Sequence, residues 1–307
     1  MKHIFLLIGI LTFQNLSAQF VLNLGKNIYN KAKIELEDGT IKEGYVLSFD
    51  DKNAYYFDTS QYEQLFASPE HNNNLTKEYY TFRENEKAKG QKINMSDIKK
   101  ISLEEPNPIT GEVETHDYEK VKIAKPNNDL EMKFWDNEVL LPLFYSNAKI
   151  KIYNFSEIKC ANRSVNSCNV SGYDYYFLPT GAEYAVKPFE ITAATLFSIK
   201  KIGPKIYAGL EYMGKDCPLY LEHLATRKSL YGESFGNAKA SKEFTKAYKD
   251  GLDEYKADLK KAKKSMSKED YRKYEIDKKW EQIRKQNEQF YNGVFNDEVM
   301  DYINSCE

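Results

Sequence analysis

The chain has 307 residues, of which 41% are hydrophobic, and its formal net charge at pH 7 is -2. This length and apolar content can supply the cores of two or three domains, which argues against a disordered chain. The near-neutral charge argues against a protein built to bind nucleic acid or an anionic membrane. The 24 tyrosines and 17 phenylalanines favour β-rich domains packed with aromatic rings.

Residues 1–18 have the organisation of a signal peptide. Lys2 precedes an apolar run from Ile4 to Phe13, and Ser17-Ala18 suits signal peptidase. The run is about ten residues long, whereas a membrane span needs ~20, so cleavage is favoured over an uncleaved anchor. No cysteine follows the run as in a lipoprotein, and no later stretch resembles a membrane span. We expect a mature protein that begins at Gln19 and is periplasmic or secreted.

Residues 19–105 are predicted to form an antiparallel small β-barrel-like module. Apolar and charged residues alternate from Ala32 to Glu37, which is the period of a half-buried strand. Asp38-Gly39 is a strong hairpin turn signal, and Gly44 in the return strand predicts a bulge or a tight bend. A third strand is expected at 54–60 and a long polar insertion at 60–90. The stretch 93–105 should then pair back to the first strand.

Short motifs in this module carry a resemblance. Asp38-Gly39-Thr40, Glu43-Gly44 and Asp97-Ile98-Lys99 are similar to the front part of a group of uncharacterised exported proteins from Bacteroidota-type bacteria. Ser17-Ala18-Gln19 and Asp216-Cys217-Pro218 fit the same group, and the glycine-bent strand resembles Sm-like and SH3-like small barrels. The resemblance implies an envelope location and no established activity.

Residues 109–235 are predicted to form a β-meander followed by short helices. The two longest strands, around 149–155 and 173–178, should flank a polar hairpin tip. Helical spacing follows from residue 189, with a predicted break at Gly203-Pro204. The next helix is expected to use Asp216 as its N-cap and Pro218 in its first turn.

Residues 238–307 are predicted to form an antiparallel helical hairpin and a short terminal helix, so the fold class is α+β. Ser267 and Asp270 predict a capped start for the second helix, and Asn292-Gly293 predicts its end. The last helix should begin near Asp297. The apolar residues of the two long helices recur at helical spacing; they are Tyr248, Leu252, Tyr255, Leu259, Ala262 and Met266 in the first, and Ile276, Trp280, Ile283 and Phe290 in the second.

Four cysteines in an exported chain favour disulfides, although they allow three pairings and could also stay as free thiols. Cys160 and Cys168 bracket a polar segment that could be the closed tip of a hairpin. Cys217 and Cys306 would then join the start of the helical region to the end of the chain. These four residues are the disulfide candidates.

One catalytic motif matches by its letters. Gly232 to Gly236 reads Gly-X-Ser-X-Gly, the nucleophile elbow of α/β-hydrolases, which needs a core strand before it and a histidine after it. The preceding residues make a poor core strand, and no histidine follows Ser234. We therefore expect a loop at this position and no catalytic residue.

Other ionisable clusters are weak site candidates. Glu112, Glu114 and His116 would share one face of a strand, but a metal site needs further ligands and support, so a solvated face is favoured and no metal or cofactor is predicted. His71 and His223 are expected at surface or internally satisfied positions. The lysines at 260–264 are balanced by interleaved acids, which predicts a solvated helix face and no nucleic-acid partner.

The function that these observations favour is a non-enzymatic cell-envelope protein that acts as a binding or scaffolding module for an unidentified protein or envelope partner. Two alternatives stay open. One is a periplasmic enzyme or carbohydrate-handling protein whose site is not visible in the sequence, and the other is a subunit of an envelope assembly that uses the helical hairpin.

Overall fold

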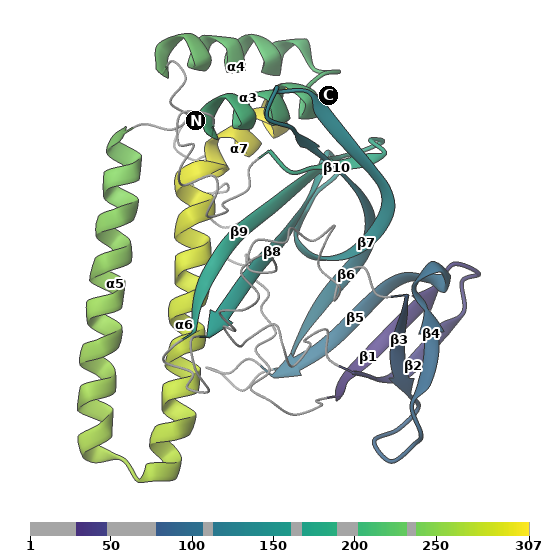
Figure 1. The fold of residues 1–307 in the computed structure, drawn as a ribbon, viewed down its shortest axis with the longest axis vertical. Helices are drawn as coiled ribbons and strands as arrows, with labels where there is room; N and C mark the ends of the chain where they lie inside the picture. The colour runs from purple at the N-terminus through teal and green to yellow at the C-terminus, as the bar shows by residue number, and fades with distance from the viewer. Residues whose placement is uncertain are drawn as a thin grey trace, which may run out of the picture.

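The computed structural model is described for residues 29–47, 78–106, 113–160, 168–188, 202–231 and 238–306. It is mixed α+β, with a closed five-stranded barrel and helices in the C-terminal region (Figure 1). The predicted signal peptide and the predicted strand at 54–60 lie outside the described residues. The strands are β1 (Tyr29–Leu36), β2 (Ile41–Leu47), β3 (Tyr79–Arg83), β4 (Gln91–Asn94), β5 (Ile98–Pro106), β6 (Val113–Pro126), β7 (Met132–Ser146), β8 (Ile150–Cys160), β9 (Cys168–Pro179) and β10 (Tyr184–Val186).

The barrel is made by β6 to β10. These strands follow one another in the sheet, and β10 pairs in parallel with β6 to close the ring, with Ala185 opposite Ile123. In the middle region, for which the sequence predicted a β-meander, β6 to β9 pair consecutively and antiparallel, and β10 closes them into a barrel. The closing strand has only three residues and pairs with a strand about 60 residues earlier, so no local pattern announces it.

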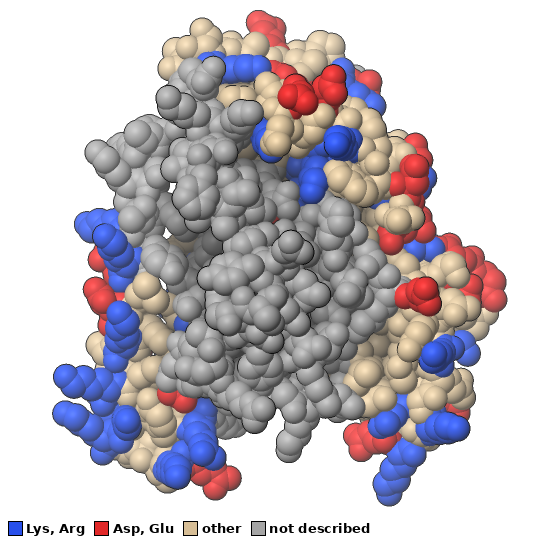
Figure 2. Space-filling model, viewed as in Figure 1, with Lys and Arg blue, Asp and Glu red and all other residues tan. Residues whose placement is uncertain are grey.

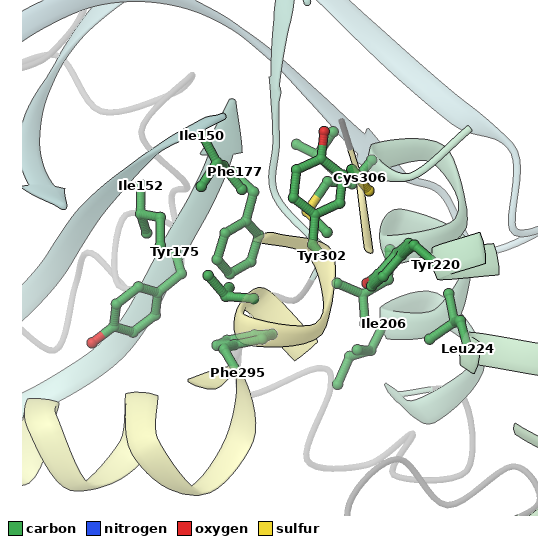
Figure 3. Packing of buried hydrophobic residues seen from close by; sticks show 14 of the residues in the cluster. Ile150, Ile152, Tyr175, Phe177, Ile206, Tyr220, Leu224, Phe295, Tyr302 and Cys306 are labelled. Atoms are coloured by element: carbon green, nitrogen blue, oxygen red, sulfur yellow. The ribbon is translucent and has the colours of Figure 1, made fainter. Parts of the chain in front are cut away.

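Alternation along β8 and β9 gives the barrel an inner and an outer face. Tyr153 and Tyr176 are opposite one another and join the inner core, together with Val121, Ile123, Val139, Leu141 and Ala185. Ile152, Tyr175 and Phe177 point the other way, into the core shared with the helices. Figure 3 shows Phe295 and Tyr302 on the helical side of that outer core. Both faces are thus buried at this level of the sheet, which explains the run of consecutive apolar residues from Tyr175 to Leu178 in β9.

The front sheet continues the barrel beyond β6, in the order β5-β1-β2-β3-β4. The predicted turn is confirmed: Gly39 has φ of 81°, and the Leu36 amide donates to the Thr40 carbonyl at 2.9 Å. The predicted return of the closing stretch to the first strand is also seen, with Ile34 opposite Ile101. No ladder joins β4 to β5 among the described strands, so the closure seen in this part of the chain is that of β6 to β10.

Two predictions for this front sheet are corrected. The stretch 60–90 is not polar insertion throughout, because it contains β3, whose Tyr80 and Phe82 are buried. Gly44 lies in regular register opposite Ala32, without a bulge. A Cβ at Gly44 would lie 2.6 Å from the Phe82 ring and would also meet the Arg83 carbonyl, so the close approach of β3 requires glycine there.

The stretch 93–105 is not a single strand. A 3-10 turn, Met95–Asp97, separates β4 from β5 and buries Met95. The front core then collects side chains from all five strands and from the start of the barrel: Ala32, Ile34, Val46, Tyr80, Phe82, Ile93, Met95, Ile98, Ile101, Leu103, Tyr118 and Leu140. Because Tyr118 and Leu140 belong to β6 and β7, these two barrel strands also contribute side chains to the front core.

The helices are α3 (Ile202–Met213), α4 (Pro218–Tyr231), α5 (Ala238–Ser265), α6 (Lys268–Val294) and α7 (Asn296–Ser305). Gly203-Pro204 begins α3, where a break was predicted, since proline suits the first turn of a helix. Pro218 begins α4 as predicted. The residue before it is Cys217, whose carbonyl accepts from the Leu221 amide at 3.1 Å, so Asp216 is one residue too early to be the cap.

The two long helices meet at Ser267, whose Oγ accepts from the Asp270 amide at 3.2 Å and donates to the Asp270 carboxylate at 2.7 Å. α6 continues past the predicted stop at Asn292-Gly293 to Val294. Its last turn meets the barrel through Tyr291, and Phe295, just after the helix, contacts Tyr175 and Phe177 with ring centroids 5.7 and 5.2 Å apart. In Figure 1, α5 lies alongside α6 at the edge of the molecule.

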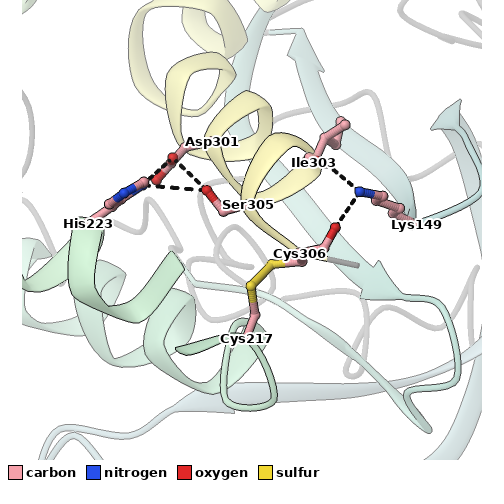
Figure 4. Close-up of a disulfide and its surroundings, with 7 residues drawn as sticks. All are labelled: Lys149, Cys217, His223, Asp301, Ile303, Ser305 and Cys306. Carbon is pink, nitrogen blue, oxygen red and sulfur yellow. Dashed lines mark hydrogen bonds and ion pairs between the residues drawn. A yellow bond between two sulfur atoms is a disulfide. The ribbon is translucent and has the colours of Figure 1, made fainter. Parts of the chain in front are cut away.

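The chain end is attached at two points (Figure 4). Cys217 and Cys306 form the predicted disulfide, with Cα atoms 5.4 Å apart. The Lys149 ammonium donates to the Ile303 carbonyl at 2.9 Å and to the Cys306 carbonyl, at the end of α7 where a cation is favourable. In the part of the chain that is described, none of the helices combines the length and apolarity that crossing a membrane requires.

Candidate functional site

One cluster of ionisable side chains joins α4 to α7. His223 Nδ1 lies 2.8 Å from Asp301 Oδ1, and Ser305 Oγ donates to the same carboxylate oxygen at 3.1 Å. Arg227 bonds Glu298 at 2.6 Å through Nη2 and Asp301 Oδ2 at 2.8 Å through Nη1. His223 was expected at a surface or internally satisfied position; Figure 4 shows it on α4 near the disulfide, with Asp301 as its partner.

This cluster contains the three residue types of a catalytic triad, but they do not have the geometry of one. In a triad, the carboxylate holds one ring nitrogen of the histidine and the serine bonds the other. Here Asp301 is at Nδ1, and Ser305 is 3.4 Å from the same nitrogen. Because Ser305 also donates to Asp301, its hydroxyl proton is directed at the carboxylate and not at the imidazole.

The electrostatics of this cluster are those of a clamp between two helices. Burial opposes ionisation of Asp301, but hydrogen bonds from His223 and Arg227 outweigh it and lower its pKa. Burial of Glu298 raises the pKa of its carboxyl despite the Arg227 partner. The pairs therefore connect α7 to α4, next to the disulfide that makes the same connection covalently.

A second cluster lies at the end of the barrel. The Lys187 ammonium is fully buried and bonds Asp174 Oδ2 at 2.9 Å, and it lies 5.6 Å from the centroid of the Tyr176 ring. The Lys187 amide donates to the Ala124 carbonyl at 2.8 Å. Both charges are paired within the fold, so this cluster fixes the chain after β10 to the barrel.

Only some of the weak site candidates from the sequence lie among the described residues. His116 is a buried residue of β6. Glu112, His71 and Ser234 lie outside the described residues, as does the side chain of Glu114. In the described ranges, no group of three or more His, Cys, Asp or Glu side chains is arranged to hold a metal ion. Cys160 and Cys168 are directly opposite in the β8 and β9 register, but their side chains are not described.

The third candidate is a groove of about 450 Å³ between α5 and α6. Its α5 wall carries three carboxylates one turn apart, Asp250, Glu254 and Asp258, which is the spacing that places residues on one helix face. The remaining lining comes from both helices: Gly251, Tyr255, Lys278, Glu281, Gln282, Lys285 and Gln289.

The two walls differ in how their charges are paired. On α6, the Glu281 carboxylate forms ion pairs with Lys278 at 2.7 Å and with Lys285 at 2.8 Å. These two interactions outweigh the effect of burial and lower the pKa of Glu281. On α5, Asp258 has a distant partner in Lys278 at 3.8 Å. Asp250 and Glu254 have no ion pair with any residue that the structure describes, so the α5 wall offers free negative charge.

The floor of the groove holds a buried amide. Gln282 is 6% exposed, and its Oε1 accepts from the Lys279 ammonium at 3.0 Å. Its Nε2 is buried and has no hydrogen-bond partner in the described part of the chain. Burial lowers the pKa of Lys279 to about 8, and its ammonium lies 5.2 Å from the Tyr255 ring centroid. A buried donor without an acceptor costs free energy, so Gln282 requires an explanation that packing alone does not give.

Comparisons with known proteins identify no relative: no family model matches the chain, and no match was found among curated proteins or among solved structures. The candidate site therefore stands on its geometry. Sequence reasoning treated 250–258 as part of a charge-balanced helix and did not single out Gln282. The signal that could have found the groove is the glutamine at a seam-facing position of α6, opposite acids spaced by four residues on α5.

Proposed function

We propose that this protein is an exported, non-enzymatic protein of the cell envelope that binds or scaffolds other envelope components. In this proposal residues 1–18 are a cleaved signal peptide, and 19–105 form a small-barrel-like module of the Sm-like or SH3-like kind. Residues 109–235 form the central body, and 238–307 form an antiparallel helical hairpin with a short terminal helix. The hairpin is the part that contacts the partner.

The observation that carries this proposal is the placement of α5. α6 is held to the barrel by the contacts of Tyr291 and Phe295 with Phe144, Tyr175 and Phe177. α5 packs on α6, through Lys278 to Asp258 and Lys279 over the Tyr255 ring. Its other side is exposed at Asp253, Lys256, Lys260 and Lys264, and this side is available for a partner.

The outward side of α5 is strongly charged. Lys260, Lys261, Lys263 and Lys264 are exposed, and Figure 2 shows basic side chains gathered over the lower half of α5 and the turn to α6, with acidic ones among them. Alternating charges of this kind suit a solvated contact surface, in which charge complementarity selects the partner. We propose no enzymatic activity. The charges of the His223 cluster are paired within that cluster, and so are those of the Lys187 cluster.

Cell fractionation tests the location. The full chain is expressed in a bacterium of the Bacteroidota type, and the purified protein is analysed by N-terminal sequencing. We expect a periplasmic or secreted product that starts at Gln19. A cytoplasmic product that retains residues 1–18 overturns the proposal.

Site-specific photocrosslinking in the same cells tests the contact. A crosslinking amino acid at Lys256, exposed on α5, should give adducts with an envelope component, and the same amino acid at Thr180, an exposed turn of the barrel, should not. Equal adducts at both positions contradict a role for the hairpin. Adducts of the chain with itself, together with a dimer in light scattering, favour the envelope-assembly alternative.

A further inference from the structure

We propose that the groove between α5 and α6 binds a short peptide segment that carries a basic side chain, with the cation at Asp250 and Glu254 and a backbone carbonyl at Gln282. This inference deepens the proposed function, on which it rests, by naming the class of ligand and the residues that recognise it. Three properties of the groove support it: its size, the charge of its α5 wall and the unpaired donor on its floor.

The size of the groove limits the ligand. A volume of about 450 Å³ is within the range of sites that take small ligands, and it suits a few residues of peptide better than a folded surface. The groove also lies between two ordered helices, so its walls are preformed and little ordering is needed on binding.

The charge of the α5 wall selects a cation. Four carboxylates and two ammonium groups line the groove, which leaves a net charge of -2, and both ammonium groups are already paired with Glu281. Asp250 and Glu254 are one turn apart, about 6 Å along the helix axis by its rise, so a lysine or arginine between them meets both. The exposed lysines at 260–264 repel a large basic partner, which restricts the ligand to a short segment with few charges.

The floor distinguishes a peptide from a simple amine. Gln282 Nε2 is a donor with less than 1 Å² of exposed surface, and Oε1 already accepts from Lys279. A ligand reaches Nε2 when the Gln282 side chain turns into the groove, and it must then offer an acceptor and not a second cation. A peptide supplies an acceptor at every residue through its backbone carbonyl, next to the side chain that carries the charge. A diamine such as putrescine has the cations but no acceptor.

NMR titration of the full mature chain, residues 19–307, tests the proposal with a defined probe. The probe is the pentapeptide Gly-Lys-Gly-Lys-Gly, blocked at both ends, at low ionic strength. We expect the Gln282 side-chain amide resonance to shift on titration, because Nε2 acquires an acceptor. The blocked Gly-Glu-Gly-Glu-Gly peptide should leave it unmoved.

Substitutions in the groove test which residues contact the lysine peptide. Asp250→Asn with Glu254→Gln should weaken lysine-peptide binding about fivefold, the loss expected for two partly exposed ion pairs. The control, Asp253→Asn with Glu269→Gln, removes the same charge from exposed positions of α5 and α6 outside the groove, and should change the affinity less than twofold. Gln282→Glu keeps the acceptor for Lys279 and removes the donor, so it should also weaken binding of the peptide.

Each contrary result rules out a specific part of the proposal. Equal weakening in the groove variant and the control means that the peptide binds the surface at large. Binding of putrescine as tightly as the peptide, with no effect of Gln282→Glu, means a cation site and not a peptide site. If the peptide fails to bind although α5 crosslinks to an envelope component in cells, this inference fails and the proposed function stands. If the protein is cytoplasmic and still binds the peptide, the proposed function fails and the site stands.

Discussion

Cys217, at the entry to α4, is bonded to Cys306, the residue after α7, and the bond closes a loop with a sequence separation of 89 residues. Removing it with Cys217→Ala and Cys306→Ala should lower the free energy of unfolding by about 4 kcal/mol, because the unfolded chain regains the entropy of that loop. Urea denaturation of the oxidised protein measures this. A change below about 1 kcal/mol contradicts a structural role, since native disulfides seldom contribute so little.

The second predicted disulfide has a mapping test. Cys160 is directly opposite Cys168 in the β8 and β9 register. We expect digestion without reduction to yield a Cys160 to Cys168 peptide pair and a Cys217 to Cys306 pair by mass spectrometry. A Cys160 to Cys217 pair would rule out this arrangement.

Gly44 and Gly251 should respond oppositely to the same substitution. Gly44→Ala places a methyl group against the Phe82 ring and the Arg83 carbonyl and should destabilise the protein by about 1–3 kcal/mol. Gly251→Ala, in the interior of α5 with nothing within 4 Å of its Cβ, should stabilise it by up to about 1 kcal/mol. Thermal and urea unfolding of the two variants give the comparison. A neutral Gly44→Ala would show that β3 can move away from β2.

Arg227 holds two carboxylates, one of them the buried Glu298. Arg227→Met should cost about 3 kcal/mol at pH 7.5, because it leaves the Glu298 charge unpaired in the interior. Without Arg227, the pKa of Glu298 rises further above its value in the unfolded chain. The folded variant then takes up a proton as the pH falls to 5, so its deficit relative to the wild type should shrink.

The control for this variant is Lys228→Met. Lys228 pairs with Glu211 at 2.7 Å on the exposed side of the same helix, where both side chains are nearly half exposed. Its loss should cost less than about 1 kcal/mol at either pH. If the two variants behave alike in urea denaturation at pH 5 and 7.5, the clamp between α4 and α7 contributes no more than a surface pair.

Lys279 should make stability rise with pH. Its pKa is lowered by burial to about 8, below the value near 10.5 of the unfolded chain. Between about pH 8 and 10 the unfolded chain therefore binds the proton more tightly, and the folded state gains stability as the pH increases. The neighbouring Tyr255 stays neutral in this window because burial raises the pKa of its hydroxyl. Below pH 8 both states are protonated and the burial penalty is present in full.

The variant Lys279→Met removes this pH dependence. Its stability relative to the wild type should decrease by about 1–2 kcal/mol between pH 7.5 and 10, as the wild type loses its penalty. Lys278→Met is the matched control, because the hydrogen bond that Lys278 donates to Glu281 raises the pKa of Lys278 and keeps it charged across the window. The same pH profile for both variants would contradict the assignment to Lys279.

The candidate groove was only partly predictable. The seam residues Tyr255, Leu259 and Ala262 are buried as their spacing predicted, and they bring α5 onto α6. The prediction was wrong for Met266, which is 40% exposed at the end of the hairpin. The buried state of Gln282 was not predictable, because a glutamine on a charged helix is exposed by default. Its position depends on which face of α6 meets α5 after both helices have packed.

The fold shows the same division. Local chemistry determined the turn at Gly39, where glycine supplies a positive φ, and the cap at Ser267, where a side-chain oxygen reaches an amide three residues on. The alternation in β1 and the helical spacing after residue 240 are equally local. In each case the partners that fix the structure are a few residues apart, so the sequence shows them together.

Only the tertiary structure decided which distant segments meet. The closure of the barrel by β10 on β6, the recruitment of Tyr80 and Phe82 into the front core, and the contact of His223 with Asp301 all join residues far apart in the chain. Such contacts depend on the summed burial of many apolar side chains, and no short window contains that sum. The disulfide between Cys217 and Cys306 is the exception, because the small number of cysteines made a contact across 89 residues predictable.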